Sequence, residues 1–108
     1  MLAPDEIARR KALKQAMRQA EREQLRSTLP ISPELMRSLF DFVDEKLSDG
    51  ECDGSLSHTL TFLGQRERPV EPAVSWLQGL GGNCDCEVLA NAEEKFIFAF
   101  PELEQREA

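Results

Sequence analysis

Three cysteines and one histidine are the residues of this 108-residue chain whose chemistry suits a metal ion. Cys84 and Cys86 flank one aspartate in "GGNCDCEV", and Cys52 and His58 stand upstream in "ECDGSLSH". Three cysteines with one histidine are a usual ligand set of closed structural zinc sites, and here they use every cysteine and the only histidine. We therefore expect one zinc site with four protein ligands. These ligands are Cys52, His58, Cys84 and Cys86.

The spacing of Cys84 and Cys86 suits an extended segment. Side chains at positions i and i+2 share one face of a strand, whereas on a helix they point in nearly opposite directions. Asp85, between them, is then expected to point away from the metal and toward water. Gly81 and Gly82 precede this segment and allow the tight backbone turn that leads into it.

Two observations weaken the zinc interpretation. Regular zinc modules carry C-x₂₋₄-C and H-x₃₋₅-H spacings, whereas this chain has C-x₅-H and C-x-C. A free cysteine also often behaves as a small buried hydrophobe, and a lone histidine is more often a surface or core residue than a ligand. The site is therefore predicted from the joint occurrence of the four residues, and not from any one of them.

A thiol redox protein is the principal alternative. Cys84 and Cys86 could close a strained disulfide across one residue, and strained disulfides are readily reduced. Asp85 and Glu87 oppose that role, because nearby negative charge raises thiol pKa values and suppresses the thiolate. A zinc-water enzyme would need His58 off the metal and Glu87 as the base. Since no phosphate loop, nucleophile elbow or His-Glu helix motif is present, we predict no catalytic residues and expect a binding or regulatory module instead of an enzyme.

Charge distinguishes the first 26 residues from the rest of the chain. The net charge is −7, and residues 1–26 hold seven Lys or Arg against four Asp or Glu, so they carry +3 and the other 82 residues carry −10. An acidic body repels nucleic acid and anionic membranes, because both present dense negative charge. We therefore expect a protein partner or a homodimer through the N-terminal helix, and neither nucleic acid nor a membrane.

A cytoplasmic location is expected, because the chain shows no secretory signal and no apolar run of about 20 residues. Thiols stay reduced in the cytoplasm, which favours metal ligands over structural disulfides. An odd number of cysteines points the same way, since no internal set of disulfides can use all three.

Two helices are predicted before the site. Residues 5–28 lack Gly and Pro and are rich in strong helix formers. The apolar stripe of this first helix is narrow, and it consists of Ile7, Leu13, Met17, Ala20 and Leu25. A second helix is expected to begin at Pro33 behind the N-cap Ser32, to carry a broad apolar core face and to close at Gly50.

Two further helices are predicted to position the cysteines. The third should start at a cap from Asp53 or Ser55 and end at Gly64, and the fourth should carry Pro72 in its first turn and stop at Gly81 or Gly82. After them, "NCDCEVLAN" and "EEKFIFAFP" are short, contain β-branched or aromatic residues and are bounded by turn formers, so short extended segments are expected there.

The predicted fold class is mainly α. We expect a small single domain of about four helices, with a short extended Cys-x-Cys segment and a short β element at the C-terminus. A core in a chain this short is thin, so a metal staple would support it. The chain is divided into a helical N-terminal extension, residues 1–29, and a metal-stapled helical domain, residues 30–108.

The segments "GLGGNCDCEVLAN", "ECDGSLSHTLTFL" and "SWL" together resemble a family of small uncharacterised bacterial proteins with a domain of unknown function. The hallmark of that family is Gly-Gly-x-Cys-Asp-Cys-Glu-Val followed by an asparagine, and the likeness covers residues 40–92. The resemblance implies no activity. Many members carry a histidine directly after the first Cys-Asp, where this chain has Gly54. If that histidine is the family's ligand, Asp53 or water would complete the shell here in place of His58.

Overall fold

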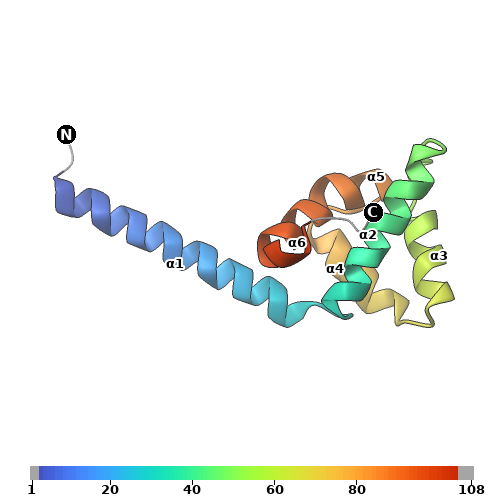
Figure 1. The fold of residues 1–108 in the computed structure, drawn as a ribbon, viewed down its shortest axis with the longest axis horizontal. Helices are drawn as coiled ribbons and strands as arrows, with labels where there is room; N and C mark the ends of the chain where they lie inside the picture. The colour runs from blue at the N-terminus through green and yellow to red at the C-terminus, as the bar shows by residue number, and fades with distance from the viewer. Residues whose placement is uncertain (1–2, 105–108) are drawn as a thin grey trace.

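The computed structural model describes residues 3–104 as a helical protein (Figure 1). Within this range no residue lies in a strand, so the mainly α fold class is confirmed. The elements in chain order are α1 (Pro4–Thr28), α2 (Pro33–Ser48), α3 (Ser57–Gln65), α4 (Val70–Gly79), α5 (Asp85–Glu87), the π-helix η1 (Val88–Ala92), α6 (Glu93–Ala99) and the 3₁₀-helix η2 (Pro101–Leu103).

The C-terminal β element predicted from the sequence is wrong, because α5, η1 and α6 follow one another without a break. Phenylalanine and isoleucine favour strands only weakly, since their preference depends on a sheet to pack against. Burial follows a helical period instead: Val88, Ala92, Phe96 and Ala99 are all fully buried and recur every three or four residues. The periodicity of these four residues therefore decides the structure of the segment.

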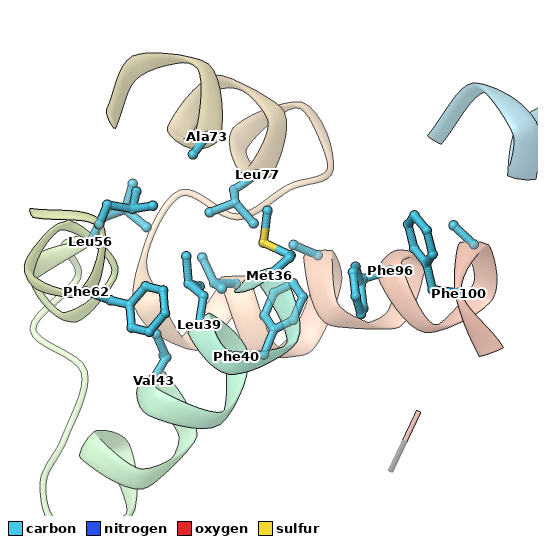
Figure 2. Packing of buried hydrophobic residues seen from close by; sticks show 14 residues of the cluster. Met36, Leu39, Phe40, Val43, Leu56, Phe62, Ala73, Leu77, Phe96 and Phe100 are labelled. Carbon is cyan, nitrogen blue, oxygen red and sulfur yellow. The ribbon is translucent and has the colours of Figure 1, made fainter. Parts of the chain in front are cut away.

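Helix α2 supplies the centre of the core. Its start is as predicted, because the Ser32 hydroxyl accepts the N–H of Leu35 at 3.2 Å. The α2 residues Met36, Leu39, Phe40 and Val43 are all fully buried. Figure 2 shows them packed among side chains of α3, α4 and α6. Phe40 meets Phe96 edge to face, with ring centroids 5.2 Å apart, and this contact joins α2 to α6.

A buried arginine fastens the C-terminal segment to the core. Arg37 of α2 is only 5% exposed, and its guanidinium forms an ion pair with Glu93 of α6. It also donates to Asp41 at 3.1 Å and to the carbonyl of Leu103 in η2 at 3.2 Å. Three segments therefore meet at one side chain.

Helix α1 projects from the body and gives the molecule its length of 55 Å (Figure 1). None of its residues is buried. Its C-terminal half is held on α6, because Arg22 donates to the carbonyl of Phe98 at 3.0 Å and Arg26 donates to that of Ala99 at 2.8 Å. No helix within residues 3–104 combines the length and the apolar character needed to cross a membrane.

Candidate metal centre

The three cysteines lie together although they come from two separate loops. Cys52 stands in the connection between α2 and α3, Cys84 directly precedes α5, and Cys86 lies within α5. All three are free thiols, with Cys52 and Cys84 half-buried and Cys86 exposed. Hydrogen bonding to the side chains of Cys86 and Cys84 contributes to a lowered pKa of the Cys52 thiol. The fold therefore brings the three cysteines close enough to shift one another's pKa values.

Backbone donors also converge on the Cys52 sulfur. The N–H of Cys86 is the largest cause of a lowered pKa at Cys52, followed by the N–H of Gly54, and desolvation opposes them only in part. Gly54 has φ of 84°, a left-handed conformation that favours glycine. Cys52 is therefore the thiol of the cluster that most readily becomes a thiolate.

The other two thiols are shifted in the opposite direction. At Cys86 the hydrogen bond that its thiol donates to Cys52 is the first cause of a raised pKa, followed by desolvation. At Cys84 an N–H bond from Glu87 lowers the pKa, but desolvation, the hydrogen bond to Cys52 and the charges of Cys52 and Glu87 outweigh it and raise the pKa.

Two backbone hydrogen bonds shape the loops that carry the sulfurs. Asp85 donates its N–H to the carbonyl of Ser55 at 2.9 Å, which joins the loop of Cys52 to that of Cys84. Val88 donates to the carbonyl of Cys84 at 2.9 Å and so begins the helical turn. As they stand, no group of three or more His, Cys, Asp or Glu side chains in residues 3–104 is arranged to hold a metal ion.

Comparison with known proteins gives the chain a family. A family model described as protein of unknown function (DUF2695) matches residues 39–91. Uncharacterized protein Rv2271 of Mycobacterium tuberculosis is 35% identical over 98 residues, which are 91% of this chain and 99% of the relative. The chain belongs to the DUF2695 family. Uncharacterized protein Mb2294 of Mycobacterium bovis matches with the same identity and coverage, and no solved structure matches the chain. The resemblance to a bacterial family of unknown function is thereby confirmed.

Asp85 lies within the DUF2695 segment. Its side chain was predicted to point toward water, and that prediction is wrong. Its side chain is 1% exposed. One carboxylate oxygen accepts the N–H of His58 at 2.9 Å, and the other accepts the N–H and the hydroxyl of Thr59 at 3.1 and 2.8 Å. The first N–H groups of a helix have no partner inside it, and the N-cap residue Leu56 offers no side-chain acceptor. Asp85 therefore caps α3 from a distant part of the chain.

Sequence reasoning missed this cap because it sought a local one. Asp53 and Ser55 were the predicted caps, and neither acts as an N-cap in the structure. Instead the Asp53 carboxylate accepts the N–H of Ser55 at 3.0 Å, and the Ser55 hydroxyl accepts the N–H of Ser57 at 3.2 Å. The position of Asp85 between two cysteines was the only signal in the sequence, and it favoured a metal-ligand loop over a cap.

The Cys-x-Cys segment of the DUF2695 protein is extended only in part. Cys84 has extended backbone angles, φ −146° and ψ 169°, but α5 begins at Asp85 and includes Cys86. The burial of Asp85 explains the difference, because its side chain must turn inward to reach the start of α3. Both cysteines still affect the pKa of Cys52, although one precedes the helical turn and the other lies within it.

Glycines and an asparagine of the DUF2695 segment shape the turn before the cysteines. Gly81 has φ of 93° and donates to the carbonyl of Gln78 at 3.0 Å, while Gly82 donates to that of Leu77 at 2.8 Å. These two bonds form the Schellman motif that closes α4, as the sequence predicted. Asn91 donates its side-chain amide to the carbonyl of Gly81 at 3.0 Å and so ties η1 to this turn.

His58 lies beside the cysteine loops at the start of α3. It is half-buried, and its backbone N–H is bound by Asp85. The pKa of the exposed Asp53 is lowered mainly by hydrogen bonds from the Ser55 hydroxyl and N–H, and to a smaller extent by the charge of His58. Asp53 and His58 are thus two further possible metal ligands near Cys52.

Proposed function

We propose that this DUF2695 protein is a zinc-binding module whose metal joins the α2–α3 loop to the α4–α5 loop. The observation that carries the proposal is that Cys52, from the α2–α3 loop, has its pKa lowered by hydrogen bonding to Cys84 and Cys86, which lie more than 30 residues later in the chain. Cys52, Cys84 and Cys86 would each give one ligand. The site is structural in this proposal, and the module acts by binding another molecule and not by catalysis.

The chemistry of the donors supports zinc. Zinc prefers thiolate ligands at about 2.3 Å in tetrahedral sites, which sets neighbouring sulfurs ~3.8 Å apart. Loading requires the three cysteines to lose their thiol protons and to turn their side chains toward the ion. The N–H groups of Cys86 and Gly54 remain as donors to the Cys52 sulfur, and such outer donors hold a metal-bound thiolate in place.

The fourth ligand is His58 in this proposal, with Asp53 or water as the other choices. The position of His58 supports it, because the histidine lies at the start of α3 and acts electrostatically on Asp53, the neighbour of Cys52. A histidine completes the Cys₃His set common in structural sites. Asp53 is exposed and already accepts two hydrogen bonds from Ser55, so binding a metal through its carboxylate would break the hydrogen bonds of that turn.

Metal content and a matched pair of variants test the proposal. Protein purified without chelator should hold one zinc per chain, and chelation should lower its melting temperature. Cys86→Ser should lose most of the metal, whereas the control Asn83→Ala should keep it, because Asn83 is the exposed neighbour of Cys84 and supplies no thiolate. His58→Gln should lower zinc affinity, because it removes the fourth ligand of the proposed site. Well under half an equivalent of zinc, with three free thiols, would refute the site.

A thiol redox function is the second candidate, and the lowered pKa of Cys52 favours it. A low-pKa thiolate touching a second thiol is the usual arrangement of a dithiol that reduces disulfides. In this function Cys52 attacks a disulfide of a partner, the resolving Cys84 or Cys86 displaces the mixed disulfide, and the partner leaves as two thiols while this chain keeps one disulfide.

Mass spectrometry of the untreated protein separates the two candidates. A zinc protein keeps three reduced cysteines that resist alkylation until a chelator is added. A redox protein shows a loss of two hydrogens and a disulfide that joins Cys52 to Cys84 or Cys86. Finding that disulfide in protein without bound zinc would reject the metal site in favour of the redox function.

A further inference from the structure

Helix α1 is held firmly at one end and free at the other. Besides the bonds of Arg22 and Arg26 to α6, Glu21 pairs with Lys95 at 3.0 Å, and the guanidinium of Arg22 lies 4.9 Å from the ring centre of Phe98. The N-terminal half, residues 4–17, extends away from the body (Figure 1). We call these residues the arm. The anchoring of α1 fixes the direction in which the arm projects.

The surface of the arm is both basic and apolar. The arm contains four Lys or Arg, all within residues 9–14, and its two acidic residues, Asp5 and Glu6, lie at its start. Leu13 and Met17 are 61% and 63% exposed, one turn apart on the helix. Most helices gain their stability by packing an apolar face, whereas Leu13 and Met17 of the arm remain exposed. The arm therefore presents a surface that suits an acidic partner with an apolar seat.

The body of the same chain carries the complementary charge. Residues 44–53, at the end of α2 and in the loop beyond it, hold five Asp or Glu and one Lys. Glu45, Asp49 and Glu51 are exposed there. In Figure 1 α2 runs away from its junction with α1, so this acidic end lies far from the arm of its own chain. The arm can reach an acidic end only in another molecule.

We propose that the arm docks on the acidic end of α2 in a second copy of this chain. Two copies that exchange arms satisfy both arms and both acidic ends, and such a reciprocal pair closes as a dimer. Charge complementarity orients the two chains and raises their association rate, and Leu13 and Met17 supply the apolar contact at the centre of the interface. The acidic segment adjoins the proposed metal site at Cys52, so the tests below change Glu45 and Asp49, which are not ligands in that proposal.

Sedimentation of the full chain tests the dimer directly. The mass should be that of a dimer in about 0.05 M NaCl and should shift toward the monomer in about 0.5 M NaCl, because salt screens exposed charge pairs. Arg10→Glu/Lys14→Glu on the arm should weaken the dimer by about tenfold or more. The control Arg66→Glu/Arg68→Glu makes the same charge change on exposed residues of the body and should leave the dimer intact.

A charge exchange identifies the acceptor. Glu45→Lys/Asp49→Lys should also weaken the dimer, since the native arm then faces positive charge. Mixing this variant with Arg10→Glu/Lys14→Glu should restore a mixed dimer, because each altered surface meets an opposite one. Circular dichroism confirms that every variant keeps its helices, and Leu13→Asn provides an uncharged arm variant that should weaken the dimer too.

Several outcomes would overturn the proposal. A chain that stays monomeric at low salt and high protein concentration rejects it, and so does a dimer that survives charge reversal of the arm. Failure of the mixed variants to associate rejects the α2 end as the acceptor. A monomer whose arm binds generic duplex DNA, or vesicles of anionic phospholipid, would assign the arm to one of those partners instead.

Discussion

Replacing the buried Asp85 by asparagine should destabilise the metal-free protein. The carboxylate accepts three hydrogen bonds, from the N–H of His58 and from the N–H and hydroxyl of Thr59. Asparagine keeps one acceptor for Thr59 and turns an NH₂ group toward the N–H of His58, so one bond becomes a contact between donors. The loss of one charge-assisted bond costs about 1.5–3 kcal/mol. We expect Asp85→Asn to lower the free energy of unfolding by about 2 kcal/mol.

Urea denaturation followed by circular dichroism measures this cost. Chelator and reductant are kept in the buffer, so that the change reflects the cap of α3 and not a metal. Asp53→Asn is the matched control, because its carboxylate is exposed and bonds only within its own loop, and a surface change of this kind is expected to cost less than about 0.5 kcal/mol. Equal stabilities of the two variants would refute the assignment of Asp85 as the cap of α3.

Two further predictions follow from the thiol cluster and the turn after α4. In metal-free, reduced protein near pH 7, Cys52 should react with iodoacetamide before Cys84. The pKa of Cys52 is lowered while that of Cys84 is raised, so Cys52 becomes a thiolate first as pH rises. Peptide mapping at several pH values checks this order, and the reverse order contradicts it. Gly81→Ala should destabilise the protein by about 1 kcal/mol or more, since φ is 93° and a Cβ would lie 3.2 Å from the Asn91 amide. Gly79→Ala in helix α4 should instead stabilise the protein by up to about 1 kcal/mol. The melting temperatures of the two variants should therefore shift in opposite directions.

Local signals in the sequence predicted the structure well. Ser32 and Pro33 mark the start of α2, because a hydroxyl cap and a proline act within one turn of themselves. The close of α4 was likewise predicted, since the conformation that Gly81 adopts is one that other residues rarely take. Each of these features is decided by residues a few positions apart, so the sequence alone contains the cause.

Non-local interactions explain the features that sequence reasoning missed. The burial of Asp85 depends on the N-terminus of α3, which is 26 residues away in the chain. The helical state of Phe96 and its neighbours depends on the apolar face of α2, which no local propensity reports. The hydrogen bond from Asp85 to Ser55 likewise joins the loop of Cys52 to the segment of Cys84 and Cys86, and the types of the ligands alone do not reveal it.

The π-helix η1 sets the rotational phase of the chain between the core and the cysteines. Glu93 donates its N–H to the carbonyl of Val88, five residues earlier, so this turn holds one residue more than an α-helical turn. Each residue of an α-helix turns the chain by about 100°. Deleting the exposed Ala90 would make the helix regular, but it would rotate Asp85 and Cys86 by about that angle relative to Phe96. Chain length in η1, and not only residue type, therefore determines whether the thiols face Cys52.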